Sequence, residues 1–123
     1  MKKTVLILST LFVSLIGLSQ TFTDGNFTYQ VQANMTDVIL TAYDEVAGGT
    51  DVVIPVTATD NGTSTTYAVK FIGYESFMSK GITSVVIPEG VTNIVNRAFI
   101  FNNLTSVVIP NSVTGIYGAA FGS

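Results

Sequence analysis

The apolar positions of the chain repeat with a fixed spacing toward its C-terminal end. Residues 82–88 read Ile-Thr-Ser-Val-Val-Ile-Pro, and residues 104–110, 22 positions later, read Leu-Thr-Ser-Val-Val-Ile-Pro. Later apolar positions match at the same spacing: Val91 with Val113, Ile94 with Ile116, Ala98 with Ala120, and Phe99 with Phe121. A period of about twenty residues is typical of a solenoid, in which stacked repeats share one core. The pattern therefore predicts a β-rich solenoid.

Alternation within each repeated segment predicts a short strand with one buried side. Val85 and Ile87 fall on one side of this strand, and Ser84 and Val86 fall on the other. The inward positions of the two repeats are Ile82, Val85, Ile87, Val91, Ile94 and Phe99, then Leu104, Val107, Ile109, Val113, Ile116 and Phe121. Burying one such side chain contributes roughly 1.5–3 kcal/mol before entropy is subtracted. Neighbouring repeats must therefore share their cores to be stable.

A stretched copy precedes these two repeats. Residues 50–55 match residues 83–88 at a spacing of 33, whereas Val69, Ile72 and Phe77 match the second repeat at a spacing of 22. The difference, 33 − 22 = 11, predicts an insertion. Asn61-Gly62 lies between β-branched residues and predicts a hairpin at 56–68, because both residues tolerate a positive φ. The predicted repeats are residues 50–81, 82–103 and an incomplete 104–123.

The segment before the repeats predicts a cap. Residues 27–43 alternate apolar and polar positions on either side of a turn near 34–37, which indicates a β-hairpin. Residues 22–26 are expected to be turn-like, and residues 44–49 to be a loop, so residues 20–49 form an N-terminal β-hairpin cap and a loop. Such a cap would cover the first open edge of the stack. Left-handed turn geometry is expected at Asn93, Asn96, Asn102, Asn103 and Gly115.

Residues 1–19 have the pattern of a secretory signal peptide. Lys2 and Lys3 precede an apolar run that ends near Gly17 and Ser19, small residues that suit cleavage after Ser19. The alternative is a membrane anchor, but the run is short for a span of about 20 residues and no positive cluster follows it. We therefore expect a secreted or cell-surface protein without a stable membrane span after cleavage.

Composition excludes several kinds of chemistry. The chain has no Cys and no His, so disulfides, the usual zinc sites and histidine acid–base catalysis are not available to it. Only 11% of residues are charged and the net charge is -3, so a nucleic-acid partner is not expected.

The acidic residues do not form a recognisable catalytic or metal-binding motif. Glu75 and Glu89 occupy non-equivalent positions in different repeats, so they do not predict a carboxylate pair. Asp44, Glu45 and Asp51 lack the spacing of a calcium loop. We expect no enzyme activity and no catalytic, cofactor-binding or metal-binding residues.

The repeats resemble the BspA-like leucine-rich repeat family. The resemblance is carried by residues 104–121, by the parallel run from Ile82, and by the inserted segment with Asn61-Gly62 that ends at residues 67–73. It implies a leucine-rich repeat fold and a bacterial protein that is secreted or displayed on the cell surface. Some members of this family are adhesins.

The outward strand positions form a candidate partner-binding face. The resemblance implies that proteins with such repeats bind their partners through the strand side. The outward rows are Thr50, Thr83 and Thr105; Asp51, Ser84 and Ser106; and Val53, Val86 and Val108. A valine row beside hydroxyl groups suits contact with a protein or glycan on a host or neighbouring cell. The alternative is that β-branched residues are there only because strands favour them.

Two functions remain open at this point. The first is a non-enzymatic, adhesin-like module that binds through this strand face or through the inserted hairpin. The second is an N-terminal capping fragment of a longer repeat array, because the sequence stops two residues after Phe121. In either case we expect the uncovered last repeat to support self-association.

Overall fold

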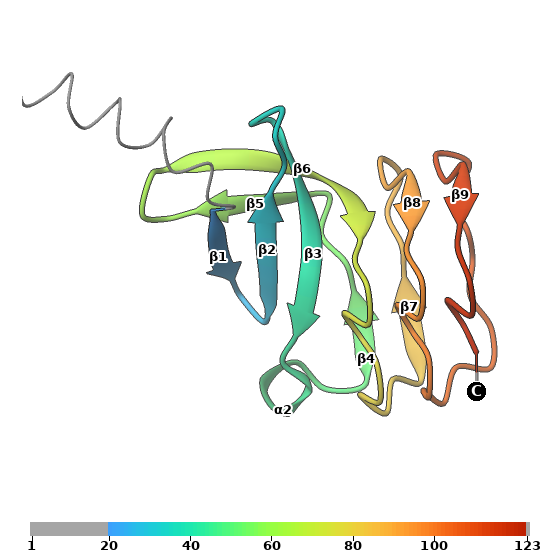
Figure 1. Cartoon of the computed structure of the whole chain (residues 1–123). Coiled ribbons are helices and arrows are strands. Elements are labelled where there is room, and N and C mark those ends of the chain that lie inside the picture. The colour runs from blue at the N-terminus through green and yellow to red at the C-terminus, as the bar shows by residue number, and fades with distance from the viewer. Residues whose placement is uncertain (1–19, 123) are drawn as a thin grey trace, which may run out of the picture.

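The computed structural model describes residues 20–122, which form nine strands and one short helix. They are β1 (Thr21–Asp24), β2 (Phe27–Val31), β3 (Asp37–Tyr43), α2 (Glu45–Gly48), β4 (Asp51–Val53), β5 (Thr57–Asp60), β6 (Thr65–Ile72), β7 (Ser84–Val86), β8 (Asn93–Ile94) and β9 (Gly115–Ile116). One sheet has the order β1-β2-β3-β6-β8-β9 with β5 also paired to β6, and a second sheet pairs β4 with β7. Figure 1 shows the cap at one end and the last repeat at the other.

The cap is a three-stranded meander rather than a hairpin. β2 and β3 pair antiparallel over the segment where the hairpin was expected, and β1 pairs antiparallel with β2. The expectation that residues 22–26 are turn-like is wrong, because Thr21–Asp24 form β1 and the chain turns at Gly25, which has φ 60°. The ring of Phe22 stacks 5.5 Å from that of Tyr29 and fixes the strand on the cap.

The segment after the cap also differs from the expected loop. Glu45–Gly48 form a single helical turn, α2, and the Asp44 carboxylate accepts hydrogen bonds from the N–H groups of Val46 and Ala47. An Asp at this position satisfies amide groups that a helix start leaves without partners.

The inserted segment forms an antiparallel hairpin, but the physical reason given for its turn is wrong. β5 and β6 pair from Thr57↔Ala68 to Asp60↔Thr65. Neither Asn61 nor Gly62 has a positive φ; Ser64 does, at 57°. The Asp60 carboxylate holds the turn instead, by accepting hydrogen bonds from Gly62 N–H and the Thr63 hydroxyl.

β6 joins the cap to the repeats. Its first half pairs with β5, its second half pairs in parallel with one side of β3, and its last two residues also pair in parallel with β8. The β8 residues then pair with β9, so that Ile72, Ile94 and Ile116 lie in one row across three repeats. The 22-residue spacing of the sequence is therefore the spacing of the hydrogen-bonded rows.

Aromatic rings stack along the same direction. The Phe77 and Phe99 rings are 4.8 Å apart and the Phe99 and Phe121 rings 5.2 Å apart, and both pairs are nearly parallel. All six inward positions named for the second repeat are buried. Those of the third repeat are all partly exposed or exposed. The third repeat also has only a single bridge, Val86↔Val108, where a strand was expected, since within the described residues it is paired on one side only.

Left-handed backbone occurs at positions other than those expected. Asn93, Asn96, Asn102, Asn103 and Gly115 all have negative φ. Positive φ angles occur instead at equivalent turn positions in the repeats: Glu75, Arg97 and Ala119, and Ser79 and Phe101. Inter-repeat bonds fix this geometry, as when Phe77 N–H donates to the Ala98 carbonyl at 2.8 Å and Phe99 N–H donates to the Ala120 carbonyl at 2.7 Å.

No helix within residues 20–122 is long and apolar enough to span a membrane. The expected signal peptide, residues 1–19, lies outside the described residues.

Two buried tyrosines of the cap predict opposite effects of removing a hydroxyl group. Tyr29 is fully buried, and within the described residues its hydroxyl has no hydrogen-bond partner. The Tyr43 hydroxyl donates to the Gly49 carbonyl at 2.8 Å. We expect Tyr29→Phe to raise the free energy of unfolding by about 1 kcal/mol, and Tyr43→Phe to lower it by about 1 kcal/mol. Urea denaturation measures the free energy of unfolding of both variants. A loss of stability in Tyr29→Phe would contradict the conclusion that the Tyr29 hydroxyl has no partner.

The Asp60 turn predicts a dependence of stability on pH. Burial raises the pKa of Asp60, but hydrogen bonds from Gly62, Thr63 and Gln20 outweigh burial and lower the pKa overall. The ionised carboxylate therefore stabilises the fold above the pKa of an unfolded Asp, and this contribution is lost as the pH falls through the folded-state pKa. Thermal unfolding between neutral and acid pH should show this loss in the wild type and a flatter profile in Asp60→Asn. If the pH profiles of the wild type and Asp60→Asn coincided, ionised Asp60 would not contribute to stability.

Candidate functional site

The candidate face is the outward side of the β4–β7 sheet and its extension into the third repeat. β4 and β7 pair in parallel, with Asp51 opposite Ser84 and Val53 opposite Val86. Between these positions, Val52 and Val85 point into the core and are buried. Strand alternation therefore places the Asp51–Ser84 and Val53–Val86 pairs on the outside, as the sequence pattern requires, whereas Thr50 and Thr83 precede the two strands.

The valine row is continuous and exposed. Val53 pairs with Val86, and Val86 forms the bridge to Val108. Their exposed fractions are 68%, 57% and 82%. Three directly paired aliphatic side chains thus form one apolar strip across all three repeats.

A polar row runs beside the valines and is organised by one carboxylate. Asp51 accepts hydrogen bonds from the Ser84 hydroxyl at 2.8 Å and from the Thr83 hydroxyl at 3.1 Å. Thr83 N–H also donates to the Thr50 carbonyl at 2.9 Å. The negative charge is confined to the first repeat, because Ser84 and Ser106 occupy the equivalent positions in the others.

All the predicted face residues are exposed to solvent: Thr50, Val53, Thr83, Ser84, Val86, Thr105, Ser106 and Val108. The structure brings the first two repeats together through hydrogen bonds, and the third through the Val108 bridge. Exposure and pairing make these residues available to a partner, but their part in binding stays a prediction.

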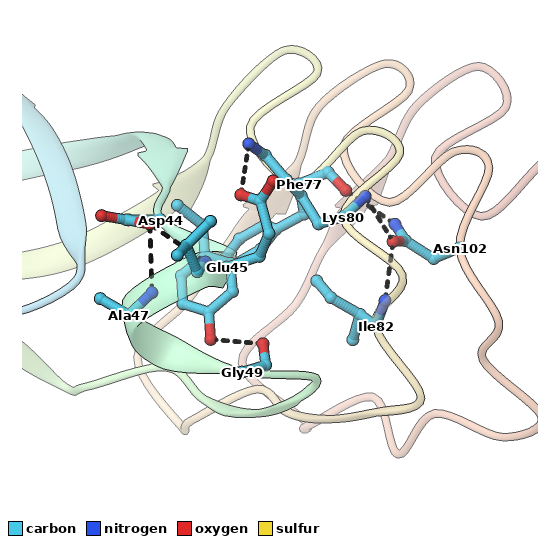
Figure 2. A network of polar contacts seen from close by, with 10 residues as sticks. Asp44, Glu45, Ala47, Gly49, Phe77, Lys80, Ile82 and Asn102 are labelled. Carbon is cyan, nitrogen blue, oxygen red and sulfur yellow. Dashed lines mark hydrogen bonds and ion pairs between the residues drawn. The ribbon is translucent and has the colours of Figure 1, made fainter.

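A polar network beside the start of β4 holds the repeats in place (Figure 2). Lys80 Nζ lies 2.7 Å from a Glu45 carboxylate oxygen and ties the first repeat to α2. The hydrogen bond and charge of Lys80 lower the pKa of Glu45. The helical turn of α2 leads through Gly49 and Thr50 into the strand face, so this ion pair helps to orient the first edge of the face.

Asn102 is the central side chain of this network. Its amide Nδ2 donates to the carbonyls of Phe77 and Phe99, at 2.7 and 2.9 Å. Its Oδ1 accepts from the N–H groups of Lys80 and Ile82, both at 3.0 Å. These four bonds connect the first and second repeats just before β7. Figure 2 shows Asn102 beside Lys80 and Ile82.

Sequence reasoning missed this role of Asn102 and treated the residue as a turn former. The only signal was the Asn itself, since the equivalent position of the first repeat is Lys80. A carboxamide can satisfy donors and acceptors at the same time, whereas a lysine ammonium can only donate.

Other acidic residues make structural contacts. Glu75 pairs with Arg97 at 3.1 Å, and the pKa of Arg97 is raised by Tyr74 and by this carboxylate. Glu89 accepts from the N–H groups of Asn111 and Ser112, each at 3.2 Å. Over residues 20–122, no three acidic side chains gather in a way that could hold a metal ion.

The comparisons with known proteins decide the family. A family model described as BspA type leucine rich repeat region (6 copies) matches residues 63–123. A solved leucine-rich repeat protein from Bacteroides capillosus ATCC 29799 is 32% identical, with a TM-score of 0.77, over 84% of this chain and 75% of that one. The chain belongs to the BspA-type leucine-rich repeat family. The resemblance and the leucine-rich repeat fold class predicted from the sequence are thereby confirmed.

Two solved structures of longer chains extend the comparison. A leucine rich cell surface protein from Faecalibacterium prausnitzii A2-165 is 27% identical, with a TM-score of 0.67, over 80% of this chain and 27% of that one. A leucine-rich repeat protein from Bacteroides ovatus ATCC 8483 is 20% identical, with a TM-score of 0.54, over 82% of this chain and 32% of that one, and shares the fold. No curated protein matches the chain.

The Asn102 contacts predict a large and local effect on stability. Asn102→Ala removes four hydrogen bonds and leaves partly buried backbone groups without partners, so we expect a loss of about 2–3 kcal/mol in the free energy of unfolding. Asn103→Ala is the matched control, because Asn103 is exposed. Urea denaturation of the two variants should separate them clearly. If the two variants had equal free energies of unfolding, the Asn102 hydrogen bonds would contribute no more than the bonds to water that replace them.

Proposed function

We propose that the chain is a non-enzymatic BspA-type repeat module that binds a protein or glycan at a cell surface through its outward strand face. The observation that carries the proposal is the strip of three directly paired valines, Val53, Val86 and Val108, exposed by 57–82% beside a polar row. Isolated apolar residues on a surface need no explanation, whereas a contiguous strip is typical of a contact surface.

The chemistry of the face favours a protein over a glycan. The strip is aliphatic, and none of the predicted face residues has the aromatic ring that stacks on sugars. The Asp51 carboxylate and the neighbouring hydroxyl groups offer hydrogen bonds along one edge. A partner that presents an apolar strip beside hydrogen-bond donors would complement both rows.

A location outside the cell is part of the same proposal. Its supports are the signal-peptide pattern of residues 1–19 and the cell-surface description of the Faecalibacterium prausnitzii neighbour. The absence of Cys and His fits a module that works by contact rather than by catalysis.

A charge-insertion pair tests the strand face. Val86→Lys with Val108→Lys places two ammonium groups in the strip and should weaken binding by about tenfold or more, because a buried apolar contact is replaced by a charge that loses its water. Val46→Lys is the control, since Val46 is 92% exposed on α2 and is not one of the face residues. The measurement is retention of each variant on immobilised extracellular-matrix extract and on whole cells.

The outcomes of this experiment are distinct. Loss of retention in the double variant alone supports the strand face. Unchanged retention in the double variant assigns binding to another surface and refutes this proposal. Retention of a wild type on purified glycans but not on proteins would reverse the preference for a protein partner.

A second candidate function is an N-terminal structural segment of a longer repeat array. Its support is that the chain spans 27% and 32% of two longer neighbours. Sequencing the gene beyond codon 123 separates the two candidates, because an array would continue in frame with further Ile-Pro and Ala-Phe repeats.

A further inference from the structure

Two asparagines of the chain precede a small residue. Asn61 is followed by Gly62, and Asn111 is followed by Ser112. The other asparagines precede larger residues: Phe27, Met35, Ile94, Arg97, Asn103 and Leu104. Asparagine is one of the thermolabile residues of proteins, and a small residue after it leaves room for the backbone reaction that converts it to an acid.

At Asn61 this reaction is a ring closure followed by hydrolysis. The Gly62 nitrogen attacks Cγ of Asn61, the bond from Cγ to Nδ2 breaks, and the side-chain nitrogen leaves as ammonia with the proton of the attacking N–H. Water then opens the cyclic imide and leaves aspartate or isoaspartate at residue 61. The Gly62 N–H must lose its proton before its nitrogen can attack, so a group that holds this proton controls the rate.

Both asparagines lie in exposed turns. Asn61 is in the turn between β5 and β6, and Asn111 is in the turn that follows Pro110. Both side chains are exposed to solvent. Burial therefore does not fix either carboxamide, and each can turn toward the N–H of the next residue.

A carboxylate accepts a hydrogen bond from the attacking N–H at both places. The Gly62 N–H donates to Asp60 Oδ1 at 2.9 Å. The Ser112 N–H donates to Glu89 Oε2 at 3.2 Å. Asp60 lies two residues before its donor, whereas Glu89 belongs to the preceding repeat and lies 23 residues before its donor. The two labile sites thus have the same contact, although it comes from unrelated positions of the fold.

A carboxylate at this distance opposes ring closure in two ways. The charge-assisted hydrogen bond has to break before the nitrogen can turn toward Cγ. The negative charge also disfavours loss of the proton, because a second negative charge would form beside it. At Asp60 the carboxylate is itself held in place, since its other oxygen accepts from Gln20 Nε2 and Thr63 Oγ1.

We propose that Asp60 protects Asn61 against deamidation by holding the Gly62 N–H. Glu89 protects Asn111 in the same way through the Ser112 N–H. Deamidation of Asn61 would add a carboxylate next to Asp60, and isoaspartate would also lengthen the backbone by a methylene group in the turn that joins β5 to β6. Asp60 therefore preserves the hairpin that connects the cap to the repeats.

The test is the rate of deamidation at each asparagine of the folded full chain, followed by peptide mass spectrometry during incubation at mildly alkaline pH. Asp60→Ala should raise the rate constant at Asn61 by about tenfold and leave that at Asn111 unchanged. Glu89→Ala should raise the rate constant at Asn111 by about threefold, because its bond is longer, and leave that at Asn61 unchanged. Each variant is the control for the other, and circular dichroism checks that both are folded.

Thr63→Val separates the hydrogen bond of the Gly62 N–H from the rigidity of the turn. This substitution removes the Thr63 hydroxyl bond to Asp60 but leaves the Gly62 N–H on the carboxylate. We expect the rate constant at Asn61 in Thr63→Val to stay close to that of the wild type.

A measurement on the wild type alone covers the case in which Asp60→Ala does not fold. The folded chain should deamidate at Asn61 about tenfold more slowly than the chain unfolded in urea, where Asp60 is no longer fixed over the Gly62 N–H. Equal rates in the two states would refute the proposal.

The variants can refute it as well. An unchanged rate at Asn61 in Asp60→Ala, or an equal rise in Thr63→Val, would show that the bond to the Gly62 N–H does not protect Asn61. An equal rise at Asn111 in Asp60→Ala would point to general loosening of the fold instead. An unchanged rate at Asn111 in Glu89→Ala would overturn the proposal for the second site.

Discussion

The structure depends on the in-register stacking of repeats whose side chains cannot be buried within one repeat. Ile72, Ile94 and Ile116 form one row, and the rings of Phe77 and Phe99 stack along the same direction. Each layer buries the layer before it and is buried by the next. Burial therefore falls sharply at the third repeat, although its inward apolar positions differ from those of the second only by Leu104 in place of Ile82.

The first layer is buried by a different kind of structure, and β6 makes this possible. The strand pairs with β5 over its first half and with β3 over its second half, and its last two residues also pair with β8, so one continuous segment belongs both to the cap and to the stack. The inserted hairpin is thus part of the cap in space, although it interrupts the first repeat in sequence. Asp60 strengthens this connection by accepting a hydrogen bond from Gln20, which precedes β1.

The sequence predicted what depends on hydrophobic spacing and missed what depends on individual polar contacts. Inward positions such as Val85 and outward ones such as Val86 followed from alternation alone. The left-handed turn residues did not follow from the sequence, because bonds between repeats hold Arg97 at a positive φ that Arg does not intrinsically favour. The four hydrogen bonds of Asn102 could not be predicted from the sequence either, since their partners are backbone groups that every residue carries. For the candidate face, the pattern placed each residue outside, but it could not show that Asp51 joins two hydroxyls.

Asn102 makes the junction between the first two repeats a junction of side chain and backbone. Its side chain fastens the first repeat to the second, and the equivalent position of the first repeat is occupied by Lys80, whose ammonium pairs with Glu45 instead. The third repeat is held to the second by backbone bonds, by the stack of Phe99 on Phe121, and by bonds from the Asn111 and Ser112 N–H groups to Glu89. A mechanical load across the junction between the first two repeats would therefore have to break these four bonds together. For a molecule anchored through its cap, the same bonds would keep the first two repeats of the strand face together under tension.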